Sequence, residues 1–295
     1  MKPTLRMGLV GCGRFGSNHA RCLQNLLGVD LVTVCDTDIA RARQLGEQYG
    51  AQAFDHVDAL MGRVDAVSIV VPANALAEVA LATLAGGIHT LVEKPMADNL
   101  ACAIKMAETA ASRDVTLQVG YLEGYHPAIT TLYETRPRPE MIDCIRLQPI
   151  DAHTSCAEVV LDIMTHDIGH VLKLMRGPPT TIDAKRMLIP GRQHTVVANL
   201  GFTDGRTARL TAGRAGQLPE RKMRVGRSGD FVTCDFLSHR VSGSADKGLV
   251  LSTNPLSAQL ADFVRTVHAR TTPRVDAADG VDALQVALDI VRRCA

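Results

Sequence analysis

A chain of 295 residues suggests one large or two ordinary domains, and its 46% hydrophobic content can supply buried cores. The formal charge of +1 argues against wholesale nucleic-acid binding, and no apolar run approaches the roughly 18 to 20 residues that a membrane span needs. Because tryptophan is absent, a sugar platform of stacked tryptophans is excluded.

The first residues lead directly into an apolar strand pattern and show no secretory signal peptide. The eight cysteines form no C-x-x-C pair and no His/Cys cluster at zinc spacing. We therefore expect free thiols, a cytoplasmic location and no metal.

Strand, glycine-rich turn and helix patterns follow one another at the start of the chain. Residues 5–10 are apolar like a buried strand, residues 11–16 read G-x-G-x-x-G, and residues 17–27 have helical spacing. This context is the one in which a dinucleotide-binding fingerprint is found.

Each glycine of this turn has a physical role in such a site. Gly11 permits the tight turn, Gly13 leaves room for a pyrophosphate, and Gly16 lets the helix approach the strand. The diphosphate is expected at the helix N-terminus, where unpaired N–H groups and the helix dipole favour an anion. The predicted cofactor-binding residues of the turn are Gly11, Gly13, Arg14, Phe15 and Gly16.

A second strand pattern ends at Asp36, twenty residues after Gly16. An acid at this distance is expected to bind the adenosine ribose hydroxyls. Thr37 and Asp38 follow, with no arginine before Arg41, so a 2′-phosphate would be repelled and NAD is predicted over NADP. The alternative is a structural turn beside a solvated aspartate.

Strand and helix patterns alternate as far as residue 120. Repeated units of this kind imply right-handed crossovers and a doubly wound parallel sheet, with ligands at the carboxyl ends of its strands. Pro72, Glu93 and Lys94 fall at such ends and are predicted to contact the cofactor. The expected strands are 64–71, 88–92 and 115–119, and the expected helices are 38–48 with Gly50 at its end, 55–61, 75–85, and 98–113 with Asp98 as its N-cap.

The second half of the chain predicts an α+β domain with an open, mostly antiparallel sheet. We expect domains at 1–120 and 121–295, with the terminal helix able to pack on the first domain. The expected strands are 141–148, 196–202, 206–212, 222–226 and 231–236, and the expected helices are 125–134, 159–175, 255–269 and 277–293, with a breaker at 136–139.

Residues 185–227 contain ten Lys and Arg residues against only Asp204 and Glu220. One interpretation is a sheet with a solvated basic face. The other is a positive field that attracts an anionic substrate such as a nucleotide sugar.

Asp162 and His166 lie four residues apart, so a helix would place them on one face, which His170 would extend. Oxidation of a secondary alcohol needs a base for the hydroxyl proton, and histidine titrates near the required pH. Lys94 could polarise the same oxygen, and Asp162 could orient the histidine or hold a neighbouring hydroxyl. From this helix alone a buried core histidine is an equal alternative for His166, a metal site is a weaker one, and Asp167 is expected to face elsewhere or to cap locally.

These motifs resemble the glucose–fructose oxidoreductase / inositol dehydrogenase / MocA family over essentially the whole chain. The matching stretches are GLVGCGRFGSNHA (8–20), VCD (34–36), GGIHTLVEKPMA (86–97), VGYLEGYHPAI (119–129) and LDIMTHDIGHVL (161–172). The resemblance implies a Rossmann domain, an open-sheet domain and a homodimer or homotetramer built through that sheet. It makes Lys94 the catalytic-site lysine, Asp162 a substrate-binding partner and His166 the acid–base residue, and Lys94-Pro95 is often a cis peptide in this family.

Within the family, the pattern resembles the UDP-N-acetylglucosamine 3-dehydrogenases. Their E-R-F-N-P segment is replaced here by Glu123-Gly124-Tyr125-His126-Pro127, and Leu76 stands in place of a common histidine. These departures fall near the expected substrate and nicotinamide. The predicted substrate-binding residues are Lys94, Tyr121, Glu123, Asp162 and His166.

The sequence thus predicts an NAD-dependent dehydrogenase that oxidises a secondary hydroxyl of a nucleotide sugar, such as UDP-N-acetylglucosamine at C3. A free-sugar or cyclitol (inositol-type) dehydrogenase is the first alternative. The second is a regulator that senses a dinucleotide without turnover.

Overall fold

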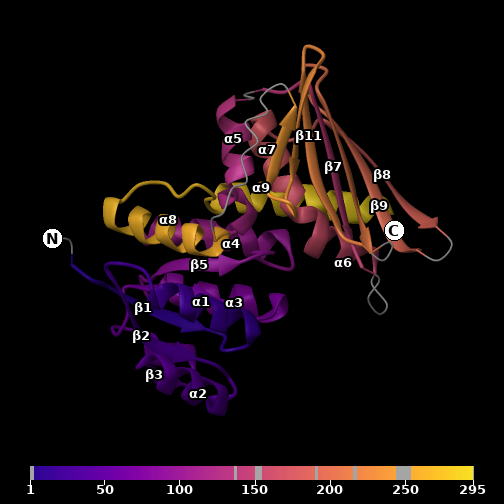
Figure 1. The fold of residues 1–295 in the computed structure, drawn as a ribbon. Coiled ribbons are helices and arrows are strands. Elements are labelled where there is room, and N and C mark those ends of the chain that lie inside the picture. Colours follow the sequence, from indigo (N-terminus) through magenta and orange to yellow (C-terminus); the bar gives the residue numbers. More distant parts are fainter. Residues whose placement is uncertain are drawn as a thin grey trace. The chain divides into compact units, whose positions relative to one another are not determined.

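The computed structural model describes residues 3–135, 138–149, 155–189, 192–214, 218–243 and 254–294. Contacts divide the chain into two compact units (Figure 1). The first contains residues 1–122 and 254–281, and the second contains residues 123–253 and 282–295.

The first unit is built on a parallel sheet with the strand order β3-β2-β1-β4-β5-β6. Reversal of strand order between β1 and β4 is the doubly wound arrangement that the sequence predicts. Its strands are β1 (Leu5–Val10), β2 (Val29–Cys35), β3 (Gln52–Phe54), β4 (Ala66–Ile69), β5 (His89–Glu93) and β6 (Leu117–Gly120). Its helices are α1 (Arg14–Gln24), α2 (Ile39–Tyr49), η1 (Val57–Leu60), α3 (Ala73–Ala85), α4 (Leu100–Ser112) and α8 (Pro255–Ala269).

Helix α8 joins the core of this first unit although it lies far along the chain. Its buried residues Leu256, Leu260 and Phe263 recur at helical spacing and pack in one cluster with Met7 of β1 and Leu23 of α1. The predicted division put this helix with residues 121–295. Hydrophobic packing instead places it in the first unit.

The second unit carries a mixed sheet with the order β13-β12-β11-β7-β10-β9-β8. Among the described strands the pairing is mostly antiparallel, as predicted, and the exception is the parallel pair of β7 and β10. The strands are β7 (Met141–Gln148), β8 (Thr181–Ile189), β9 (Arg192–Gly201), β10 (Thr207–Arg214), β11 (Glu220–Arg227), β12 (Asp230–Asp235) and β13 (Arg240–Gly243). The remaining helices are η2 (Leu122–Tyr125), α5 (Pro127–Thr135), α6 (Cys156–Glu158), η3 (Val159–Met164), α7 (Thr165–Met175) and α9 (Ala277–Cys294), of which η2 and α9 each divide between the units.

Helices cover only one face of this second sheet in the described part of the chain. Figure 1 shows α5 and α7 along the same side, where α5 contacts β12 and α7 contacts β10. Alternation along β7 buries Ile142, Cys144 and Arg146 on the covered face.

Two local predictions are corrected by the structure. Helix α4 is capped by Asn99, whose side chain accepts a hydrogen bond from the Cys102 N–H, and not by Asp98. The helix expected at 159–175 begins as a π-helix, η3, which becomes α-helical at Thr165. Of the expected breaker, residues 136 and 137 lie outside the described residues.

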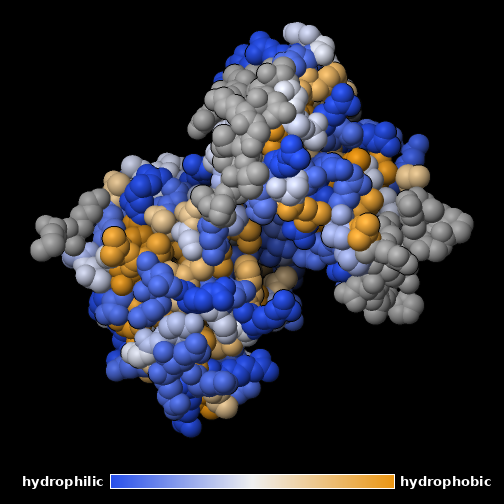
Figure 2. All heavy atoms as spheres, viewed as in Figure 1, coloured by the Kyte–Doolittle hydropathy of each residue, from blue (hydrophilic) through white to orange (hydrophobic). Residues whose placement is uncertain are grey.

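On the face shown in Figure 2, hydrophilic residues predominate and apolar residues form separate small groups. No helix within the described ranges is long and apolar enough to cross a membrane. All eight cysteines are free, as predicted, and six of them are buried.

Candidate functional site

The carboxyl ends of β1, β2 and β4 border a pocket in the first unit. Its volume is about 670 Å³, and its lining includes Gly11, Gly13, Asp36 and Pro72. Four of the predicted cofactor-binding residues, distant in sequence, therefore meet at one edge of the parallel sheet.

The glycine turn has no room for larger residues at two of its three glycines. Gly11 has φ = +98°, and a Cβ there would lie 2.1 Å from the Val70 carbonyl oxygen. A Cβ on Gly16 would lie 1.9 Å from the Gly11 carbonyl oxygen. By contrast, a Cβ on Gly13 would meet no atom within 4 Å, so the space beside it is open to a ligand.

Helix α1 begins at Arg14, and its N-cap is Gly13, with no capping hydrogen bond from a described side chain. The first N–H groups of a helix have no intrahelical acceptor, so they can bind an anion. Arg14 and Phe15 are exposed in this first turn. These observations fit the pyrophosphate of a dinucleotide.

Asp36 follows β2, and its side chain is hydrogen-bonded to the backbone of the glycine turn. One carboxylate oxygen accepts a hydrogen bond from the Cys12 N–H at 2.7 Å, and the other accepts one from the Asp38 N–H at 2.9 Å. Arg41 also lines the pocket, but its guanidinium is paired with Asp38 at 3.1 Å.

Strand β5 ends at Glu93, and Lys94 follows it at the carboxyl edge of the same sheet. Glu93 is buried, and one of its oxygens lies 3.4 Å from the Lys94 backbone nitrogen. The Lys94-Pro95 peptide bond is cis, as the family resemblance predicts.

Asp162 and His166 lie in the second unit, on opposite sides of the change from π- to α-helix. Asp162 belongs to η3, where its side chain is 57% exposed and lies 3.8 Å from the Arg214 guanidinium. His166 lies in the first turn of α7 and is partly buried. The helix is therefore not regular from Asp162 to His166, and the expectation that the two side chains share a face stays a prediction.

His170 and Asp167 have different surroundings from His166. The ring of His170 is buried and its Nδ1 lies 2.9 Å from the Tyr133 hydroxyl. Asp167 is buried, and its carboxylate accepts two hydrogen bonds from Arg146. The described residues contain no group of three or more side chains suited to hold a metal ion.

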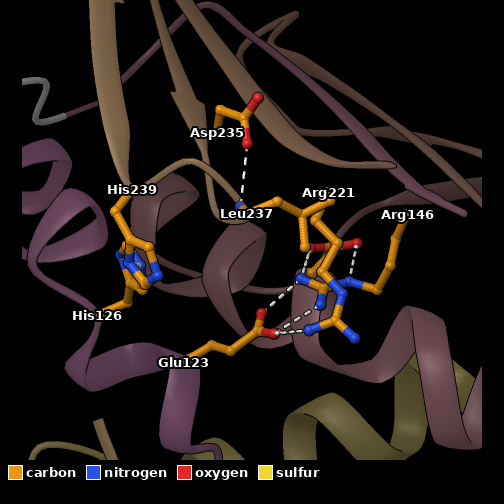
Figure 3. A network of polar contacts seen from close by, with 8 residues as sticks. Glu123, His126, Arg146, Arg221, Asp235, Leu237 and His239 are labelled. Carbon is orange, nitrogen blue, oxygen red and sulfur yellow. Dashed lines mark hydrogen bonds and ion pairs between the residues drawn. The ribbon is translucent and has the colours of Figure 1, made fainter. Parts of the chain in front are cut away.

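A buried arginine lies at the centre of a polar network in the second unit (Figure 3). Arg146 of β7 donates two hydrogen bonds to Glu123, at 2.7 and 2.5 Å, and two to Asp167, at 2.9 and 2.7 Å. A second guanidinium, that of Arg221, lies 3.5 Å from Glu123. Glu123, predicted to bind substrate, thus has its carboxylate held by arginines, and the side chain of Tyr121 is also buried.

Burial and charge act in opposite directions on this network. Burial raises the pKa of Glu123, but the charges of Arg146 and His166 outweigh it and hold that pKa well below its usual range. For Asp167, burial has the larger effect and its pKa is raised despite Arg146. The pKa of Arg146 is raised because two carboxylates outweigh its own burial.

His126, which replaces the asparagine of the related motif, stacks on a second histidine. The rings of His126 and His239 are 4.8 Å apart, with His126 Nε2 lying 2.8 Å from His239 Nδ1. Burial and the neighbouring His239 lower the pKa of His126. The sequence analysis did not identify His239, because it lies in a turn far along the chain.

Acid is expected to destabilise the second unit through His170. Burial lowers its pKa to about 4, whereas an unfolded histidine titrates near 6.5. Between these two pH values the unfolded state binds the proton and the folded state does not. The free energy of unfolding therefore falls as the pH drops. The loss reaches about 3 kcal/mol at pH 4. Urea unfolding from pH 7 to pH 5 should therefore show a shallower loss in His170→Gln than in the wild type. Equal slopes would contradict this assignment.

The basic residues of 185–227 divide between the two faces of the sheet. Arg209 and Arg224 are exposed and flank Asp143 in register on the open face. Arg221 pairs with the buried Arg146 in register and so lies on the covered face, and Arg214 approaches Asp162. Arg209 and Arg224 therefore agree with a solvated basic face, whereas Arg214 and Arg221 lie where they could attract an anionic substrate.

The fold and the pocket define a dinucleotide-binding protein of the Rossmann type. Residues 5–121 match the oxidoreductase family with an NAD-binding Rossmann fold. The UDP-N-acetylglucosamine 3-dehydrogenase of Acidithiobacillus ferrooxidans is 28% identical over 97% of this chain and 96% of its own length. Its solved structure gives a TM-score of 0.90, covering 98% of this chain and 97% of that one.

Other similar proteins are named for inositols. An inositol 2-dehydrogenase of Corynebacterium glutamicum is 26% identical over 63% of this chain and 58% of its own length. A scyllo-inositol dehydrogenase of Lactobacillus casei, solved with NAD(H) and scyllo-inositol, shares the fold at 18% identity, with a TM-score of 0.84 and coverage of 99% and 97%. The match of residues 5–121 to this oxidoreductase family, together with similarity to a named dehydrogenase over nearly the whole chain, confirms the predicted resemblance and the predicted class of enzyme, a dehydrogenase.

Proposed function

We propose that this enzyme uses NAD to oxidise a secondary hydroxyl of a nucleotide-linked sugar, with UDP-N-acetylglucosamine at C3 as the first candidate. The observation that carries the proposal is the place of Lys94. It follows β5 at the carboxyl edge of the sheet where the glycine turn and Asp36 border the cofactor pocket. Bound NAD would supply the hydride acceptor.

The cofactor residues in this proposal are Gly11, Gly13, Arg14, Phe15, Gly16, Asp36, Pro72, Glu93 and Lys94. The amides at the start of α1 bind the pyrophosphate, and Asp36 accepts hydrogen bonds from the adenosine ribose. Arg41 is paired with Asp38 and Asp36 lies in the pocket, so a 2′-phosphate meets negative charge there. This supports NAD over NADP.

In the proposed reaction, the ammonium of Lys94 donates a hydrogen bond to the reacting hydroxyl and stabilises its developing negative charge. His166 accepts the hydroxyl proton as general base. Asp162, with an exposed carboxylate, binds a neighbouring sugar hydroxyl. Tyr121 and Glu123 support binding of the sugar.

A nucleotide-linked substrate is favoured over a free sugar by the full-length relative named for such a sugar. The guanidinium of Arg214, near Asp162, also favours an anionic substrate. A free sugar or cyclitol is the alternative, favoured by the relatives that act on inositols. A regulator that senses a dinucleotide without turnover is the remaining alternative.

Turnover of a substrate panel separates these possibilities. Purified enzyme and NAD are mixed with UDP-sugars, the matching free sugars and inositols, and NADH formation is followed. The proposal expects NADH from UDP-N-acetylhexosamines at a kcat/KM at least about tenfold above that of the free sugars. Preference for a free sugar or inositol would overturn the substrate class, and bound NAD with no turnover of any compound would favour a regulator.

Replacing Asp36 is expected to change cofactor choice. Asp36→Ser should raise KM for NAD roughly 10- to 100-fold, since hydrogen bonds to a charged acceptor contribute about 1.5 to 3 kcal/mol. It should also increase the use of NADP, because the repulsion of a 2′-phosphate is removed. Titration of binding with NADH and NADPH checks both effects, and an exposed-site variant, Asp98→Ser, serves as control. An unchanged ratio of the two affinities would contradict the assigned role.

The open face of the second sheet supports a homodimer or homotetramer. Helices cover its other face, while Met141 and Met187 are exposed side chains on these strands. Sedimentation at several protein concentrations tests this part of the proposal, and a monomer at all of them would overturn it. A cytoplasmic location completes the proposal and rests on the free cysteines.

A further inference from the structure

A buried histidine lies beneath the loop that carries Lys94. His19 of α1 is fully buried, and its Nδ1 lies 2.9 Å from the hydroxyl of Ser68 on β4. Its Nε2 lies 3.4 Å from a carboxylate oxygen of Glu93, the last residue of β5. The three side chains join the first helix to two central strands of the sheet.

The chemistry of these groups selects one tautomer of the imidazole. A carboxylate only accepts hydrogen bonds, whereas a serine hydroxyl can donate or accept. With its proton on Nε2, His19 turns an N–H donor toward Glu93, and its Nδ1 accepts a hydrogen bond from the Ser68 hydroxyl. Neither Nε2 of His19 nor the facing Glu93 oxygen makes a hydrogen bond to a described residue, so the 3.4 Å approach of these two buried atoms is the one polar contact of each within the described part of the chain.

The carboxylate of Glu93 lies between the backbone of Gly120 and that of Lys94. A Cβ on Gly120 of β6 would lie 2.7 Å from one carboxylate oxygen, so the glycine admits this carboxylate beside it. The other oxygen faces the backbone N–H of Lys94 at 3.4 Å. A rotation of the Glu93 carboxylate would therefore disturb the peptide from which the Lys94 side chain extends.

We propose that His19 is a positioning residue that acts through Glu93 to fix the Lys94 peptide. The inference rests on the proposed role of Lys94 in catalysis. It gives a role to a histidine that follows the glycine turn yet is too buried to touch a substrate. His19 does not exchange a proton with substrate, and its contribution is the orientation of Lys94.

Two substitutions of similar size separate the two ends of the imidazole. In His19→Gln the side-chain amide can reach the place of Nε2 and donate to Glu93, whereas in His19→Asn the shorter amide reaches only the place of Nδ1. We expect kcat to fall at least about tenfold in His19→Asn and to stay within about threefold of wild type in His19→Gln. KM for NAD should change less than about threefold in both.

His89 provides a matched control, because it lies at the opposite end of β5 and its Nδ1 accepts a hydrogen bond from the Thr116 N–H at 2.9 Å. His89→Asn and His89→Gln should leave kcat unchanged, even where they lower the melting temperature. Ser68→Ala removes only the Nδ1 partner and should lower kcat less than His19→Asn. Equal kcat in the asparagine and glutamine variants of His19 would overturn the proposal, as would a loss of kcat that simply follows the melting temperature in all four histidine variants.

Nuclear magnetic resonance of histidine-labelled wild type tests the contact without turnover. The proposal expects a slowly exchanging Nε2–H signal that disappears in His19→Asn and shifts in Glu93→Gln. Protonation of Nδ1 in its place would overturn the proposal even in an active enzyme. Wild-type protein that oxidises no sugar but gives this signal would contradict the proposed function and leave the His19–Glu93 contact in place.

Discussion

Lys94→Ala is expected to lower kcat at least about 100-fold while NAD still binds. The ammonium is assigned to stabilise negative charge on the reacting oxygen, and loss of one such donor typically costs 10²- to 10³-fold. Binding of the dinucleotide rests mainly on the glycine turn and Asp36, which this change does not touch. Steady-state kinetics together with NADH titration checks both statements, and Lys105→Ala on the exposed surface of α4 is the control.

His166→Ala belongs to the same prediction and should also lower kcat at least about 100-fold, the usual size of a lost acid–base group. Turnover should recover partly at high pH, where hydroxide and buffer bases replace the imidazole. A control, His268→Ala on α8, should have wild-type kcat. Near wild-type turnover in both Lys94→Ala and His166→Ala would contradict the assignment of these residues to catalysis.

Arg146→Met is expected to destabilise the second unit by about 3 to 5 kcal/mol. Removing the guanidinium leaves the carboxylates of Glu123 and Asp167 buried without the cation that holds both. Methionine is long enough to fill much of the arginine stem, so lost charge and not lost volume dominates the change. Urea unfolding followed by circular dichroism measures the effect.

A triple variant that removes all three charges separates the effect of lost charge on stability from the effect of lost packing. Arg146→Met combined with Glu123→Gln and Asp167→Asn removes all three charges, and it should recover at least half of the lost stability because no unpaired carboxylate remains buried. A single Arg146→Met variant that loses less than about 1 kcal/mol would show that the network contributes little.

Much of the first unit could be predicted from the sequence because its signals are local. Residues 64–71 form a β-branched run typical of a buried parallel strand, and the strand is found at Ala66–Ile69. Gly50 ends α2 with φ = +71°, as expected of a glycine at that place. The helix cap was misplaced by one residue because Asp98 and Asn99 are both good capping residues, and only the backbone conformation separates them.

Two features of the fold depend on tertiary packing and could not be predicted from the sequence: the π-helix and the unit to which α8 belongs. The π-helix at Val159–Met164 has no local sequence signature, so the expected register of Asp162 and His166 was that of a regular helix. Helix α8 packs with β1 and α1 although some 230 residues separate them in the chain.

The Arg146 network was missed, although the sequence carried one signal for it. The alternation of 141–148 places Arg146 on the same side as Ile142 and Cys144, which are apolar. A charged residue on an apolar face needs a buried partner of opposite charge. Its partners, Glu123 and Asp167, come from separate elements, and sequence alone could not pair them.

The central claim is hydride transfer from a sugar carbon to NAD, and deuterium transfer tests it most directly. UDP-N-acetylglucosamine carrying deuterium at C3 is incubated with enzyme and NAD, and the NADH is analysed by mass spectrometry. The account predicts one deuterium in each NADH formed and a slower turnover than with the unlabelled sugar whenever hydride transfer limits the rate. NADH without deuterium would place the oxidation at another carbon, and no NADH with this sugar, its free form or inositols would contradict the account.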